Sequence, residues 1–138
     1  IKLGGTVEVY AGGGPISELS KLPRESLCRL IVVRLGPDAI KSMDELEPLK
    51  SCRMVRVLEL HGKGVGDIGM DRFREYAALE TLDLSDTSIA DIAMLNFAKC
   101  KNLTELKLDR TKVSEITMGN VKGYKQLRHL SLANTLAS

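Results

Sequence analysis

The segment LETLDLSDTSI at residues 79–89 decides the fold, because its pattern returns as LTELKLDRTKV at 103–113 and as LRHLSLANT at 127–135. Each copy starts 24 residues after the one before it. Upstream, the copy VRVLELHGKGV at 55–65 keeps this spacing. The copy before it, LIVVRLGPDAI at 30–40, starts 25 residues earlier, which is one residue more than the other intervals. Repetition at a fixed period of this length predicts stacked structural units that bury their apolar faces against one another.

The second half of each unit repeats as well, which excludes a chance recurrence of one motif. Three columns of residues recur at the same spacing: Ile68, Ile92 and Ile116; Phe73, Phe97 and Val121; and Cys52, Tyr76, Cys100 and Tyr124. Within the first half, the alternating apolar positions of L-x-x-L-x-L point to one side of a strand. The units therefore predict a parallel sheet with its leucines facing inward and its other face exposed.

This pattern resembles the leucine-rich-repeat family, whose unit is a short strand followed by a turn and a helical or 3₁₀ segment. The resemblance implies an α/β fold: a curved, horseshoe-shaped solenoid with a concave parallel β-sheet and short helical or 3₁₀ convex segments. Thr87, Thr111 and Thr135 stand where the family usually carries the asparagine of its ladder. A threonine hydroxyl can still satisfy a backbone group of the turn.

One leucine-rich-repeat domain of about five to six repeats is predicted for residues 1–138. We expect an irregular N-terminal rung over 1–29, with a degenerate unit near Val7 and a short helix over 20–27, and regular repeats over 30–138. The sequence stops after the strand and turn of a sixth unit, which would leave Leu130 and Leu132 poorly covered. We expect the natural protein to continue, or a partner to cover this edge.

Composition and charge give little information about the cellular compartment of this chain. The chain has 138 residues, is 43% hydrophobic and carries a formal charge of +2. No apolar run approaches the roughly 20 residues of a membrane helix, so no membrane interaction is expected. Three cysteines without C-x-x-C spacing favour a reducing, cytoplasmic compartment. The Asn102-Leu103-Thr104 sequon keeps a secreted or cell-surface location open.

The cysteines are interpreted as packing residues. Cys52 and Cys100 share a column with two tyrosines, so the position requires a buried group of medium or large size, and we expect free, shielded thiols. A cysteine just before the next L-x-x-L also resembles the cysteine-containing subclass found in ubiquitin-ligase substrate receptors. That subclass has a slightly longer unit and a second cysteine where Thr111 stands, so the resemblance is partial. It suggests substrate recognition within a ubiquitin ligase as an alternative function.

No enzyme activity, metal or cofactor is predicted. His61 and His129 lie three rungs apart, about 14 Å at the strand spacing, which is too far to share a metal or a proton. The GKGVG segment at 62–66 lacks the G-K-[ST] ending of a nucleotide loop and is expected to form a tight turn. A fourth column, Asp67, Asp91 and Glu115, recurs just before the isoleucine column and is expected to cap helix N-termini.

Two basic columns are predicted to form a positive stripe on the convex surface. They are Lys50, Arg74 and Lys122, and, three residues along, Arg53, Lys101 and Lys125. Solvation of that face is the simplest interpretation. Binding of a nucleic acid or another acidic partner is the second alternative function, but no aromatic residues interleave with these charges, so nucleic acid is not the expected partner.

The concave face carries the predicted site. Its central columns are Val32, Val57, Thr81, Glu105 and His129, and beside them Arg34, Glu59, Asp83, Lys107 and Ser131, with Asp86, Asp109 and Arg110 further along. An apolar centre in the early rungs with a charged rim is typical of protein interfaces. The chain is therefore predicted to be a non-enzymatic scaffold that binds a protein partner. The predicted partner-binding residues are Ile31, Val32, Arg34, Val57, Glu59, Thr81, Asp83, Lys107, Asp109, Arg110 and His129.

Overall fold

The computed structural model describes residues 31–37 and 39–137. The predicted irregular rung over 1–29, with its degenerate unit, its short helix over 20–27 and Cys28, lies outside the described residues.

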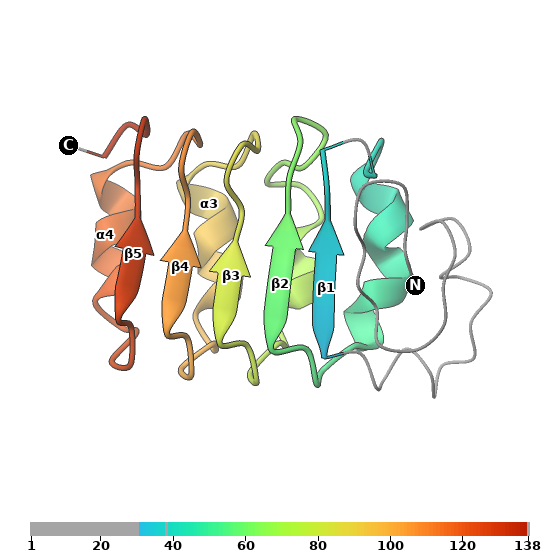
Figure 1. Cartoon of the computed structure of the whole chain (residues 1–138), viewed down its shortest axis with the longest axis horizontal. Helices are drawn as coiled ribbons and strands as arrows, with labels where there is room; N and C mark the ends of the chain where they lie inside the picture. Colours follow the sequence, from blue (N-terminus) through green and yellow to red (C-terminus); the bar gives the residue numbers. More distant parts are fainter. Residues whose placement is uncertain (1–30, 38, 138) are drawn as a thin grey trace.

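Five short strands form one parallel sheet in chain order (Figure 1). They are β1 (Val32–Leu35), β2 (Val57–Leu60), β3 (Thr81–Asp83), β4 (Glu105–Lys107) and β5 (His129–Ser131). The inward leucines pair in register, with Leu58 opposite Leu82, Leu82 opposite Leu106 and Leu106 opposite Leu130. The predicted columns are therefore confirmed. β5 lies at the edge of the sheet, and Leu130 is 38% exposed whereas Leu106 is fully buried, as expected from the sequence.

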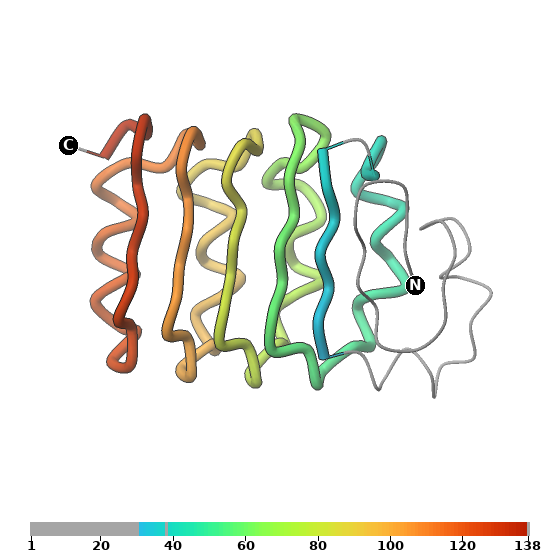
Figure 2. The backbone as a smooth tube through the Cα atoms, in the orientation of Figure 1, coloured from blue at the N-terminus to red at the C-terminus, as the bar shows by residue number. Residues whose placement is uncertain are grey.

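Short helical segments return the chain along the opposite face between successive strands (Figure 2), and the interval from β3 to β4 contains two of them. They are η1 (Met43–Ser51), η2 (Met70–Phe73), α3 (Asp91–Met94), η3 (Leu95–Phe97) and α4 (Glu115–Val121). Three of the five are 3₁₀ helices, whose rise per residue is larger than that of an α-helix. A rung of 24 residues can thus cross its convex side with few residues. The result is the leucine-rich-repeat solenoid that the sequence predicted.

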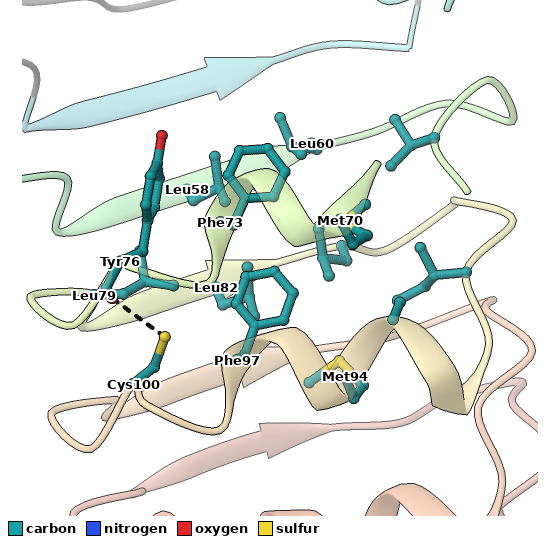
Figure 3. Close-up of a cluster of buried hydrophobic side chains, with 14 of the residues drawn as sticks. Leu58, Leu60, Met70, Phe73, Tyr76, Leu79, Leu82, Met94, Phe97 and Cys100 are labelled. Carbon is teal, nitrogen blue, oxygen red and sulfur yellow. Dashed lines mark hydrogen bonds between the residues drawn. The ribbon is translucent and has the colours of Figure 1, made fainter. Parts of the chain in front are cut away.

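The core lies between the sheet and the convex segments (Figure 3). Phe73 and Phe97, from successive rungs, stack with ring centroids 6.2 Å apart. Tyr76 is fully buried and its hydroxyl donates to the carbonyl of Leu49, 2.6 Å away in the preceding rung. An aromatic side chain at this position therefore joins two rungs through both packing and a hydrogen bond.

The thiols of the two described cysteines are reduced and buried, as predicted. The thiol of Cys100 lies 3.2 Å from the carbonyl oxygen of Tyr76, one rung earlier in the same column. Burial raises the pKa of Cys100 to about 12. A thiol held in this protonated state packs as a small apolar group and is a poor nucleophile.

The hydroxyls of the threonine column satisfy backbone groups of the turns, as predicted. Thr87, Thr111 and Thr135 each donate their hydroxyl to the carbonyl three residues earlier, over 2.6, 2.7 and 2.9 Å respectively. Thr87 and Thr111 are buried, so each bond satisfies a carbonyl that water cannot reach.

The turn that follows each of the strands β2 to β5 contains one residue in the left-handed backbone region. These residues recur every 24 positions as Gly62, Asp86, Arg110 and Asn134, with φ values of 109°, 60°, 55° and 57°. At Gly62 there is no room for a side chain, since a Cβ there would lie 2.7 Å from the carbonyl oxygen of Pro37. The 62–66 segment is thus a tight turn between rungs, as predicted, and its first glycine is required by both φ and close approach.

Asp91 and Glu115 lie in the first turns of α3 and α4, as predicted. The capping hydrogen bonds of Asp67 and Asp91, however, go to the next rung. Asp67 accepts a hydrogen bond from the backbone amide of Ala90 over 2.8 Å, and Asp91 accepts from the amides of Ser114 and Thr117 over 2.8 and 3.1 Å. Each carboxylate therefore secures the start of the convex segment in the following rung. The stacking of rungs brings those free amides within reach, which spacing along a single rung does not reveal.

Asp91 should make the stability of the stack depend on pH. Burial opposes its charged form, but the hydrogen bonds from Ser114 and Thr117 outweigh that effect and lower the pKa of Asp91. A carboxyl whose pKa is lower in the folded state stabilises the fold at neutral pH, and this stability is lost as the pH falls through the folded-state pKa. We expect Asp91→Asn to be less stable than the wild type at pH 7, and the difference to shrink below about pH 4.

Urea titrations at several pH values measure this difference. The matched control is Asp71→Asn, because Asp71 is an exposed acid with no ion pair in the described part of the chain. A difference between Asp91→Asn and the wild type that stays constant from pH 7 to about pH 3 would contradict the assignment.

Candidate functional site

The sheet arranges the predicted site residues in two parallel rows on its exposed face. In the first row, Val32 lies opposite Val57, Val57 opposite Thr81, Thr81 opposite Glu105, and Glu105 opposite His129. In the second row, Arg34, Glu59, Asp83, Lys107 and Ser131 follow one another in the same way. On β1 to β4 their neighbours along the strand are buried leucines and Val33, so these side chains occupy the outer face, and the register extends both rows to β5.

An apolar patch with a charged margin lies on β1 and β2. Val32 and Val57 are partner residues in the sheet and are half-buried, and the adjoining Ile31 is 38% exposed. Next along the same two strands, Arg34 Nε lies 3.1 Å from Glu59 Oε2. The structure thus brings five of the predicted residues together in one small area, which we call the concave patch: Ile31, Val32, Arg34, Val57 and Glu59.

The middle rungs carry charges that are already paired. Lys107 Nζ lies 2.8 Å from Glu105 Oε1 on the same strand. Their hydrogen bond raises the pKa of Lys107 and lowers the pKa of Glu105, so both stay charged at neutral pH. On β3, Asp83 accepts a hydrogen bond from the amide of Ser85 over 2.9 Å. These residues form a polar surface beside the concave patch.

Asp109 and Arg110 lie outside the rows, in the turn that follows β4. Asp109 accepts hydrogen bonds from the amide of Ala133 and the hydroxyl of Ser131, over 2.7 and 2.6 Å. Arg110 binds both carboxylate oxygens of Asp86, with Nη2 2.7 Å from Oδ2. The structure therefore separates these two predicted residues from the concave patch and gives each a bond to a neighbouring rung.

A hollow of about 570 Å³ lies at the ends of the first strands, and the sequence analysis did not predict it. Pro37, His61, Gly62, Lys63 and Asp86 line it. His61 donates a hydrogen bond from Nδ1 to the carbonyl of Ser85 over 2.8 Å. At Asp86, the hydrogen bond from Arg110 lowers the pKa of the carboxyl group. The described residues contain no group of three or more histidine, cysteine or acidic side chains that could hold a metal ion.

Comparison with known proteins agrees with this geometry. Residues 77–136 match the family described as leucine rich repeat. Over these residues the chain has the leucine-rich-repeat pattern, and its fold is that of a leucine-rich-repeat solenoid. An internalin from Listeria monocytogenes has a similar crystal structure, with a TM-score of 0.67 at 20% sequence identity. The match covers 82% of this chain but 31% of the internalin chain, so it shows the fold alone.

The comparison with curated protein sequences gave no match. Leucine-rich-repeat domains are typically non-enzymatic modules of protein interaction, and the described rungs have the platform on which such modules bind. In the described ranges, no helix is long and apolar enough to cross a membrane. The family match over residues 77–136 and the solenoid fold therefore support a protein-interaction scaffold in general terms.

Proposed function

We propose that this leucine-rich-repeat protein binds a protein partner on its concave face, through the concave patch on β1 and β2. The observation that carries the proposal is the position of Val32 and Val57, which lie side by side on the exposed face with the Arg34–Glu59 ion pair next to them. A polar solvated sheet face would place no adjoining valines there. Strand propensity explains an isolated valine, but it does not explain the exposed Ile31 beside this pair.

Rigidity of the platform supports the same function. Val33 and Leu58, which alternate with the patch residues, are buried in the core, so the patch side chains project from a fixed backbone. Such a surface loses little conformational entropy when a partner binds. The paired charges of the middle rungs, Glu105 with Lys107, supply a polar rim that can set the orientation of the partner.

The two alternative functions gain no specific support from the described residues. Arg74 of the convex basic stripe donates to the side-chain oxygen of Asn96 over 2.9 Å, so one of its donors is already used within the chain. Thr111, where the ubiquitin-ligase subclass carries a cysteine, satisfies its own turn. Nucleic-acid binding and ubiquitin-ligase recognition stay predictions from the sequence.

Site-specific photo-crosslinking tests which face binds. We would place a benzoyl-phenylalanine at Thr81, next to the concave patch, and in a second variant at Lys125 on the convex side. Irradiation in lysate should give a discrete covalent adduct from Thr81 and none from Lys125, because a photoprobe reacts only with a neighbour in direct contact. An adduct that forms only from Lys125 would move the interface to the convex face.

A further inference from the structure

Asp83 lies next to the concave patch and has no lysine or arginine partner within residues 31–37 and 39–137. It stands on β3 as the register partner of Glu59, a patch residue on β2 (Figure 1). One carboxylate oxygen, Oδ1, accepts a hydrogen bond from the amide of Ser85 over 2.9 Å. The other, Oδ2, lies 3.9 Å from Nε2 of His61, which is too long for a hydrogen bond.

His61 does not supply the missing donor when its ring is neutral. Its Nδ1 is 2.8 Å from the carbonyl oxygen of Ser85, and a carbonyl only accepts, so the proton of the neutral ring is on Nδ1. Nε2 is then an acceptor, and two acceptors, Nε2 and Oδ2 of Asp83, face each other. A nitrogen donor placed over their midpoint is within ordinary hydrogen-bond length, about 2.8 Å, of both atoms.

The exposed face of the first four strands has one more acidic than basic side chain. Its two rows contain two bases and three acids, namely Arg34, Lys107, Glu59, Asp83 and Glu105. The turns at 61–63, 85–87 and 109–111 add two of each, namely Lys63, Arg110, Asp86 and Asp109. Three of the four bases form ion pairs on this face: Arg34 with Glu59, Lys107 with Glu105, and Arg110 with Asp86.

The remaining groups do not neutralise Asp83. Lys107 lies opposite it in the register, but the ammonium group of Lys107 is bound to Glu105 over 2.8 Å. Lys63 donates to a backbone carbonyl of the next rung over 3.4 Å. The other acid without an ion pair in the described ranges, Asp109, lies outside the rows and accepts hydrogen bonds from the last rung. The surplus negative charge beside the concave patch is therefore that of Asp83.

A partner that covers the concave patch also takes water away from Asp83, because Asp83 adjoins Glu59 in the sheet. Removing water from a carboxylate that has no counter-ion costs free energy and opposes binding. A lysine or arginine side chain of the partner removes this cost, since it supplies both the charge and the donors. An acidic side chain at the same place increases the cost.

We propose that the partner is a protein segment that places an apolar side chain on Val32 and Val57 and a lysine or arginine side chain between Asp83 and His61. This inference rests on the proposed function, because it specifies what the same patch binds. The strand spacing of about 4.8 Å and the rise of about 3.3 Å per residue set the two contacts about 10 Å apart. Complementary charge at Asp83 then fixes the orientation in which the apolar side chain docks.

Selection of random short peptides, displayed on phage, against the immobilised whole chain tests this chemistry. The informative peptides bind the wild type but not the double variant Val32→Glu and Val57→Glu, so their binding depends on the concave patch. We expect them to contain a lysine or arginine in addition to an apolar residue. Synthetic copies should bind Asp83→Asn at least about tenfold more weakly than the wild type, because asparagine keeps an acceptor for Ser85 but lacks the charge.

Asp71→Asn is the matched control, because it removes one carboxylate from η2 on the convex side and should leave the affinity unchanged. Circular dichroism shows that each variant is folded, and fluorescence anisotropy of the labelled peptides gives the affinities. Patch-dependent peptides that lack basic residues, or that bind Asp83→Asn as tightly as the wild type, would overturn this inference and leave the proposed function intact. A selection that yields no patch-dependent peptide would count against both.

Discussion

The double variant Val32→Glu and Val57→Glu should lose more than about a hundredfold of its affinity for a partner bound on the concave patch, equivalent to about 2.7 kcal/mol. The two positions are direct neighbours in the sheet register, so the new carboxylates repel each other and face the apolar surface of the partner. Burying charge against such a surface without a counter-ion costs several kcal/mol. The inward residues of the same strands, Val33 and Leu58, are unchanged and stay in the core.

Lys101→Glu with Lys125→Glu is the matched control, because it also changes two side chains but on the convex side. Distal charges mainly alter the association rate and its salt dependence, so this variant should bind within a few-fold of the wild type. Circular dichroism first shows that the wild type and both double variants are folded. Titration calorimetry then measures the affinity of each for the partner that photo-crosslinking has identified. A concave double variant that keeps full affinity, with a convex one that does not, would reverse the assignment of the face.

The substitution Leu106→Ala should lower the free energy of unfolding by about 2 to 5 kcal/mol. Leu106 is fully buried on β4, between Leu82 and Leu130 of the adjacent strands. Shortening it removes apolar contacts with both rungs and leaves a cavity that the short strands cannot close. Because each rung is stabilised by its neighbours, a cavity at this position weakens two interfaces of the stack.

The adjacent variant Lys107→Ala is the control, with an expected loss below about 0.5 kcal/mol. Lys107 points outward, and its ion pair with Glu105 is partly exposed, so its net contribution is small. Urea unfolding of both variants, followed by circular dichroism, gives the two values. Equal losses at the two positions would refute the assignment of Leu106 to the inward face and Lys107 to the outward face of β4.

The rows of the concave face could be predicted from the sequence, whereas the positions of the turn residues could not. The two rows of the concave face could be predicted residue by residue, because a strand alternates its side chains and a constant repeat length places equivalent positions side by side. Val32 beside Val57 and Arg34 beside Glu59 follow from these two facts alone. Asp109 and Arg110 could not be separated from the rows in this way, since their turn conformation and their bonds to Ala133 and Asp86 depend on the adjacent rung.

By itself, the sequence determined the solenoid, the register of its sheet, the buried cysteines and the use of threonine in the turns, because each of these depends on a period that can be counted along the chain. Only the tertiary structure decided which helix each acidic residue secures and which column is left outside the core. Asp91 bonds to Ser114 and Thr117 because stacking brings the next rung's amides to it. The column of Ile68, Ile92 and Ile116 recurs as regularly as the phenylalanine column, yet Ile92 is exposed and Phe97 is buried. The two columns have the same spacing in the sequence, so the repeat period does not tell which of them is buried. The exposure of each side chain depends on how the short convex segment is oriented against the adjacent rungs.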